Sequence, residues 1–232
     1  VLRQPDLGTA IILIMTAGVI FFLAGVRAWK FGVLMGTILV SLPFAWAMLH
    51  SYQKNRILTF LDPESDHLGS GYHIMQSKIA LGSGGTTGLG LGNGRQKLGF
   101  VPEHQTDFIF SVIGEELGLV ATVAIVIGFI LFVVCGTFIA MRARDFFGYL
   151  LASGLTLLVG IQAFINIGVV TGTLPNKGLP LPFISRGGTN LVAMLFCVGV
   201  LLSVARFAGR EERSKSVAAA VSYTHLTLPT KA

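Results

Sequence analysis

Long runs of apolar residues, separated by short polar stretches, dominate the chain. A helix that crosses the hydrocarbon core of a bilayer needs about 20 mostly apolar residues. About five segments meet this length; they cover residues 9–26, 31–49, 119–140, 147–170 and 191–205, the last extended back to Gly187. Pro43 interrupts the second segment, which a membrane helix tolerates when neighbouring groups satisfy the freed carbonyl. The pattern predicts an all-α polytopic membrane protein.

Composition supports a membrane protein. Hydrophobic residues make up 53% of the 232 residues and charged residues only 12%, about half the charged fraction of a typical soluble domain. Cys135 and Cys197 both lie inside apolar runs. We therefore interpret them as small packing residues, not as a disulfide or a metal site.

The basic residues indicate topology rather than nucleic-acid binding. The net charge is +6, but Arg27, Lys30, Arg142, Arg144 and the stretch 206–215 all flank apolar segments. The positive-inside rule places such short basic segments in the cytoplasm. Residues 1–8, 50–118 and 171–186 are then expected on the outer face.

The predicted outer loop 50–118 is too long for a simple connector and is rich in glycine, including GSGG (82–85) and GLGLGNG (88–94). It has no G-x-G-x-x-G register within a βαβ unit. Apolar and aromatic residues recur along it, which argues against a disordered linker. We expect a folded loop with short helices and tight turns, in which glycine lets backbone segments approach closely.

Asp107 is the strongest candidate for chemistry. It lies where the polar part of this loop becomes apolar, near the outer membrane boundary. Partial desolvation there would raise its pKa toward that of a useful general base. The alternative is that Asp107, or Thr106, caps the helix that follows.

Further polar residues have structural and functional interpretations. Glu115 and Glu116 fall about two turns after Asp107 on a helix that starts there; interhelical hydrogen bonds are favoured over a proton or cation site. Asn166, within the fourth apolar segment, is interpreted as a helix–helix hydrogen bond. The five histidines show no paired metal-ligand spacing.

The segment Thr171–Gly188 (TGTLPNKGLPLPFISRGG) is stiffened by three prolines and carries two formal charges, Lys177 and Arg186. A rigid cationic loop at the membrane surface suits a lipid-linked phosphate or pyrophosphate. Contact with ordinary anionic headgroups is the alternative. Lys78, Arg95 and Lys97 add positive charge on the same face.

Four stretches carry a resemblance to a known family: QPDLG (4–8), residues 56–85, residues 90–118 and LPNKGLPLPFISRGG (174–188). They resemble the shape, elongation, division and sporulation family, of the FtsW/RodA type, over about residues 1–210. Members of that family have about ten spans. The resemblance thus implies that this chain is the C-terminal half of such a protein, with one membrane domain over residues 1–220. The chain also starts without Met, which fits a fragment.

The resemblance implies a peptidoglycan glycosyltransferase of the bacterial cytoplasmic membrane, acting on its extracytoplasmic side. The substrate would be lipid II, a disaccharide-pentapeptide on undecaprenyl pyrophosphate. The partners would be a class B penicillin-binding protein and other divisome or elongasome proteins. A divalent cation, Mg²⁺ or Mn²⁺, is an open requirement. A lipid II flippase and a non-catalytic scaffold are the alternative functions.

The resemblance also implies site residues. Asp107 matches the essential aspartate of the family's TDFIF motif, and Lys177 the lysine of its P-x-K-G motif. Glu103 and Glu116 match acidic positions, and Lys97 and Ser185 complete the expected substrate-binding set. Arg186 stands where the family usually has an aromatic residue. The motifs slightly favour the FtsW branch over RodA.

The last residues, 221–232 (VSYTHLTLPTKA), break sharply from the preceding composition. We interpret them as a non-native tail and leave them out of the fold prediction.

Overall fold

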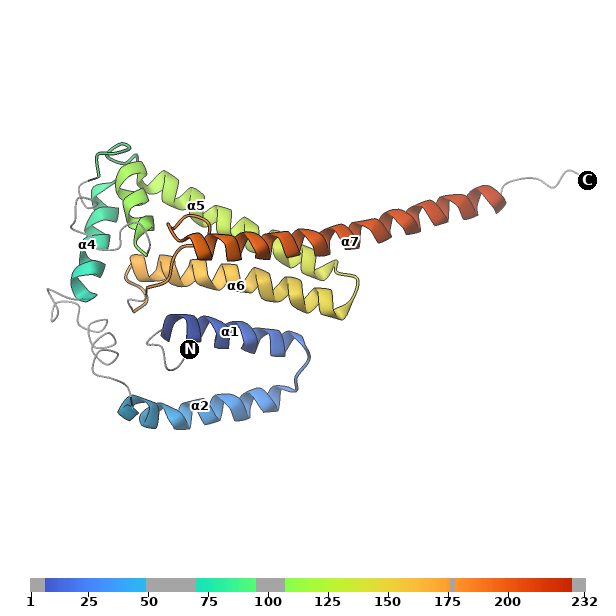
Figure 1. Ribbon diagram of the computed structural model, residues 1–232, viewed down its shortest axis with the longest axis horizontal. Helices are drawn as coiled ribbons and strands as arrows, with labels where there is room; N and C mark the ends of the chain where they lie inside the picture. The colour runs from blue at the N-terminus through green and yellow to red at the C-terminus, as the bar shows by residue number, and fades with distance from the viewer. Residues whose placement is uncertain (1–6, 49–69, 95–106, 176–177, 227–232) are drawn as a thin grey trace, which may run out of the picture.

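The computed structural model describes residues 7–48, 70–94, 107–175 and 178–226. Within these ranges the secondary structure is helical, with no strand (Figure 1). The helices are α1 (Leu7–Leu23), α2 (Ala28–Met48), α4 (Ser70–Ser83), α5 (Ile109–Met141), α6 (Phe146–Val170) and α7 (Gly188–Leu226). The predicted all-α class is confirmed.

Helix α6 is the centre of the bundle, because α1, α5 and α7 all pack against it. Ile109–Met141, Phe146–Val170 and Gly188–Gly209 are each long and apolar enough to cross a membrane. Large apolar side chains on these helices point outward; Val120 is 69% exposed, Phe164 70% and Phe196 72%. Such surfaces suit lipid rather than water. The first two predicted segments form α1 and α2, of which α1 is the shorter at 17 residues.

The helix ends separate into two groups (Figure 1). The α1–α2 and α5–α6 turns lie together at one end, while α4, the start of α5 and the start of α7 lie at the other. Arg27, Arg142 and Arg144 are exposed in or beside the first pair of turns. The structure therefore segregates the short basic turns from the end that carries Asp107, as the charge pattern predicts.

The third membrane segment, predicted to begin at about Leu119, is the second section of a longer, interrupted helix. Helix α5 begins at Ile109 and is broken at Gly118, where the backbone leaves the helical region at φ 75° and ψ −169°. Residues 109–118, predicted as part of the outer loop 50–118, thus form the first section of α5. The sequence did not predict this first section as part of the helix, because Glu115 and Glu116 interrupt the apolar run just before Gly118.

The break is filled by the glycine loop, residues 84–94. Leu89 N donates to Glu115 O at 3.0 Å and Gly90 N to Glu116 O at 2.9 Å. In the other direction, Leu119 N donates to Gly85 O at 2.9 Å. Backbone groups that leave a membrane helix need partners within the protein. The glycine loop supplies them.

Glycine is required at these contacts by space and by conformation. A Cβ on Gly84 would overlap the carbonyl of Gly114, and a Cβ on Gly88 would overlap that of Glu116. Gly85, Gly88, Gly90 and Gly92 also have positive φ angles, which side chains disfavour. The predicted close approach of backbone segments is confirmed at the glycine loop.

Helix α7 is longer than the fifth predicted segment. It begins at Gly188 and continues to Leu226, well past Ala205, and so includes the first residues of the stretch 221–232. Whether that stretch is foreign to the protein stays a prediction.

Candidate functional site

Asp107 lies two residues before α5 and is partly exposed. The N-cap position of α5 is held by Phe108, without a side-chain cap hydrogen bond. Asp107 therefore precedes the N-cap position, and Thr106 lies outside the described residues. Phe108 and Phe110 are buried at 4% and 3% exposure, so the backbone beside Asp107 is anchored in the core.

The Asp107 carboxylate faces the proline loop, residues 171–187. A Cβ placed on Gly178 would lie 2.8 Å from Asp107 Oδ2. Gly178 directly follows Lys177, which itself lies outside the described residues. The fold thus brings the loop that carries the predicted cations against the predicted base, across about seventy residues of sequence.

Hydrogen bonds within the proline loop fix its turn. Leu181 N donates to Ser185 Oγ at 2.7 Å, and Ser185 N donates back to Leu181 O at 3.1 Å. Ser185 is 7% exposed, so the described contact of its hydroxyl, predicted to bind substrate, is with the loop itself. The next residue, Arg186, is exposed, on the same turn.

Asn166 joins α6 to this site. Its Nδ2 donates to the Asp107 carbonyl at 2.8 Å and also to the Leu179 carbonyl. The predicted helix–helix hydrogen bond is wrong, because both acceptors are backbone carbonyls outside the helices.

Gln162 is a residue that the sequence analysis missed. Its Nε2 donates to the Pro180 carbonyl at 2.9 Å and to Asn190 Oδ1 at 3.2 Å. The signal was present, since Gln162 and Asn166 are four residues apart and therefore share one face of a mostly apolar helix.

Glu115 and Glu116 lie at the glycine loop. Glu115 Oε2 and Glu116 Oε1 each lie 3.0 Å from the position of a Cβ on Gly94. Glu115 is 1% exposed, so it is part of the packed junction between the glycine loop and α5. Glu103, Lys97 and Arg95 lie outside the described residues.

Lys78, on α4, lies beside the carboxyl end of α6. A Cβ on Gly172 would overlap the end of the Lys78 side chain. An ammonium group stabilises the negative end of a helix dipole. Ser77 supports the same contact, because its hydroxyl donates to Val170 O at 2.9 Å. Both residues tie α4 to the end of the bundle that carries Asp107.

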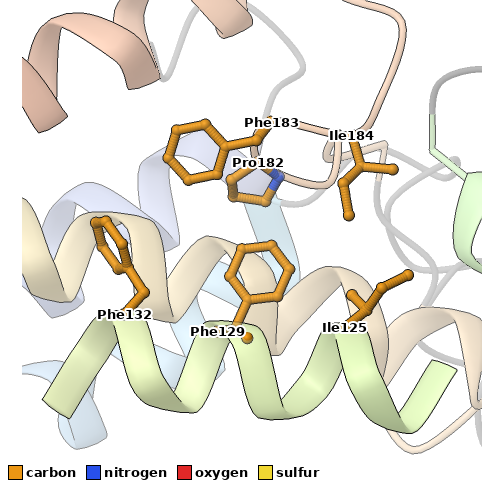
Figure 2. A pocket seen from close by; sticks show the side chains of 7 residues that line it. Ile125, Phe129, Phe132, Pro182, Phe183 and Ile184 are labelled. Atoms are coloured by element: carbon orange, nitrogen blue, oxygen red, sulfur yellow. The ribbon is translucent and has the colours of Figure 1, made fainter. Parts of the chain in front are cut away.

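An apolar cavity opens beside the proline loop (Figure 2). Its volume is about 270 Å³, and α5 and the proline loop line it with Ile125, Gly128, Phe129, Phe132, Pro182, Phe183 and Ile184. The Phe132 and Phe183 ring centroids are 6.0 Å apart. Phe183 has a φ of 65°, an uncommon conformation for a large side chain and one often found at functional sites.

Metal-ligating side chains do not gather in the part of the chain that the structure describes. No group of three or more His, Cys, Asp or Glu residues there is placed to hold an ion.

The bundle and the polar cluster define a polytopic membrane protein with a candidate site at one end of its helices. A family model described as a cell cycle protein and named for FtsW, RodA and SpoVE matches residues 1–210. The chain belongs to the FtsW/RodA/SpoVE family.

Curated relatives come from several branches of that family. The chain is 47% identical over 205 residues to the probable peptidoglycan glycosyltransferase FtsW of Geobacter metallireducens, covering 88% of this chain and 54% of the relative. It is 44% identical to the peptidoglycan glycosyltransferase MrdB of Escherichia coli, covering 94% and 59%. Stage V sporulation protein E of Bacillus subtilis is also 44% identical, with 89% and 56% covered.

The fold has a solved counterpart. A chain in a peptidoglycan synthase complex, described as coordinating polymerization and crosslinking, matches with a TM-score of 0.73 and 31% identity. The match covers 89% of this chain and 57% of that one. The chain thus spans little more than half the length of the relatives it matches, and their similar identities do not separate the FtsW and RodA branches.

Proposed function

We propose that the protein to which this chain belongs is a peptidoglycan glycosyltransferase that polymerises lipid II. The carrying observation is the approach of Asp107 Oδ2 to Gly178, 2.8 Å from a Cβ position there. It supports an active site in which one carboxylate meets a loop with two cationic residues. Relatives named as peptidoglycan glycosyltransferases support the same reaction class.

The proposed reaction is a single displacement with inversion. The 4-hydroxyl of the acceptor sugar attacks the anomeric carbon of the donor glycan, and the bond to the lipid pyrophosphate breaks. Asp107 accepts the hydroxyl proton as general base. Its partial exposure lets a substrate hydroxyl reach it.

Lys177 and Arg186 would stabilise the charge that develops on the leaving pyrophosphate. Arg186 is exposed and follows Ser185, whose hydrogen bond to Leu181 N fixes the turn of the proline loop. An exposed side chain on a fixed turn suits a group that must meet a ligand. Glu103, Glu116 and Lys97 stay predicted substrate-binding residues. Glu116 lies at the glycine loop.

The apolar cavity would hold part of the polyprenyl chain. Pro182, Phe183 and Ile184 line it and precede Arg186 by a few residues. A lipid tail in the cavity would therefore place its pyrophosphate near the cationic part of the loop. Such positioning of donor and acceptor is itself a large source of rate.

We place this site on the extracytoplasmic side of the bacterial cytoplasmic membrane. The segregation of Arg27, Arg142 and Arg144 at the opposite end supports that orientation. A class B penicillin-binding protein, within the divisome or the elongasome, is the proposed partner. The similarity to a chain of a peptidoglycan synthase complex supports it.

A divalent cation, Mg²⁺ or Mn²⁺, belongs to the proposal as a requirement of the substrate pyrophosphate. The described side chains offer no cluster of three ligands for it, so no step is assigned to it. Polymerisation that stops with EDTA and returns with Mg²⁺ would support the requirement.

The test uses the full-length protein with its penicillin-binding partner, lipid II and an assay of glycan chain length. Asp107→Asn should lower polymerisation by about 100-fold or more, as expected for loss of a general base, while lipid II binding and thermal stability stay close to wild type. Normal polymerisation by this variant would end the base assignment. Movement of lipid II across liposome membranes without any polymer would favour the flippase, and the absence of both activities in the wild-type protein would favour a scaffold.

A further inference from the structure

The amide side chains of Asn166 and Gln162 form a paired contact between α6 and the catalytic end of the bundle. Each amide nitrogen has two N–H groups to donate, and each has two acceptors in the structure. The acceptors are the carbonyls of Asp107, Leu179 and Pro180 and the side-chain oxygen of Asn190. Two residues on one face of α6 are therefore hydrogen-bonded to the residue before Phe108, to the proline loop and to the start of α7.

Asn166 and Gln162 are both buried, so water does not compete for their hydrogen bonds. Asn166 is 2% exposed and Gln162 is 6% exposed. In a low-dielectric setting an amide that lost its acceptors would be left unsatisfied at a cost, so the two residues resist any shift of the segments they hold.

The side-chain oxygen of Asn166 is energetically unfavourable where it lies. Its Oδ1 is buried and has no hydrogen-bond partner among the described residues. Buried polar atoms are rarely left this way, and those that are call for an explanation. An apolar side chain of similar size would pack here without a buried, unpaired oxygen. The two N–H groups of Asn166 therefore explain this residue better than packing does.

We propose that Asn166 is a positioning residue for catalysis, which rests on the proposed function of Asp107. One N–H fixes the backbone of Asp107 and the other fixes Leu179, two residues beyond Lys177. A single amide therefore sets the separation between the base and the loop that meets the leaving group. Gln162 performs the equivalent task one turn away for the loop and α7, without touching Asp107.

The two residues are therefore expected to differ in kinetics. Asn166→Leu removes both donors at similar volume and should lower kcat at least 10-fold, with KM for lipid II changed less than threefold. Gln162→Leu leaves the Asp107 contact intact and should act mainly on KM, through the proline loop. Displacement of a reacting group by about 1 Å is enough for such losses in rate.

Thr156→Val is the matched control. Thr156 is buried on the same helix at 2% exposure, and the described hydrogen bond of its hydroxyl stays within α6, to Ala152 O at 2.8 Å. Its loss should change thermal stability but leave kcat and KM within twofold of wild type. Should Asn166→Leu fail to fold, Asn166→Ser keeps one donor in a smaller side chain and is judged by the same criteria.

The measurement is steady-state polymerisation by the full-length protein with its partner, normalised to folded protein and compared with the thermal midpoint. The proposal is supported if Asn166→Leu lowers kcat more than Thr156→Val does while the two variants are equally stable. Full kcat, or a loss that only follows the folded fraction, overturns it. An active Asp107→Asn would instead overturn the proposed function, so the two failures are distinguishable.

Discussion

Gly178 and Asp107 meet so closely that the smallest side chain at Gly178 would contact the carboxylate. A Cβ there would lie 2.8 Å from Asp107 Oδ2 and 3.8 Å from its carboxyl carbon. Glycine is therefore needed at this position for space. The glycine after Lys177 is in this sense part of the wall of the proposed active site.

Gly178→Ala should lower kcat about 10-fold or more, because the new methyl group displaces the carboxylate from its position. Thermal stability should change little, since the contacted atom is the end of a side chain. Polymerisation kinetics on lipid II check the first expectation, and thermal unfolding in detergent checks the second.

Gly188→Ala is the control for this variant. Gly188 begins α7 and has nothing within 4 Å of its Cβ position. It should keep wild-type kinetics. Equal kinetics for both variants would show that Asp107 tolerates displacement, contrary to a base held in one position.

The sequence predicted the helices of the bundle well because their apolar runs are long and their basic turns are short. It also located Asp107, since a carboxylate at the edge of an apolar run is conspicuous. The break in α5 escaped prediction because it depends on hydrogen bonds between Gly118's neighbours and the glycine loop, about thirty residues earlier. Gln162 escaped because its acceptors belong to two other segments.

Gly118→Ala tests the junction between α5 and the glycine loop. The combination of φ 75° and ψ −169° is almost confined to glycine, and a Cβ would also meet Thr86 O at 2.6 Å. A loss of about 3 kcal/mol or more is expected from strain and overlap together, seen as a fall of roughly 5–10 °C in Tm.

Gly199→Ala provides the comparison, because it lies within α7 with nothing within 4 Å of its Cβ position. Helix propensity predicts a neutral or slightly stabilising change of up to about 1 kcal/mol. Similar Tm values for the two variants would mean that the break at Gly118 is not needed for the fold.

Arg186→Ala addresses the leaving-group side of the site. Arg186 is exposed, so solvent screens its charge and the expected effect is modest, about a 3- to 10-fold rise in KM for lipid II. Arg186→Lys should recover part of the loss. Arg206→Ala removes another exposed arginine, on α7, and should leave KM unchanged. A rise there as large as at Arg186 would indicate general attraction to anionic lipid.

Phe183→Ala tests whether the apolar cavity receives the lipid chain. The Phe183 ring lines the cavity opposite α5 (Figure 2), and burial of apolar surface is worth about 25 cal/mol per Å². The preference for undecaprenyl over a short-chain lipid II, measured as the ratio of kcat/KM values, should therefore fall about 5- to 30-fold. Phe183→Gly should show the same loss of preference with higher thermal stability than Phe183→Ala, because glycine adopts the φ of 65° without strain. Phe196, 72% exposed on α7 and away from the cavity lining, gives the control: Phe196→Ala should keep the preference. A preference retained by both Phe183 variants would place the polyprenyl chain elsewhere on the bundle.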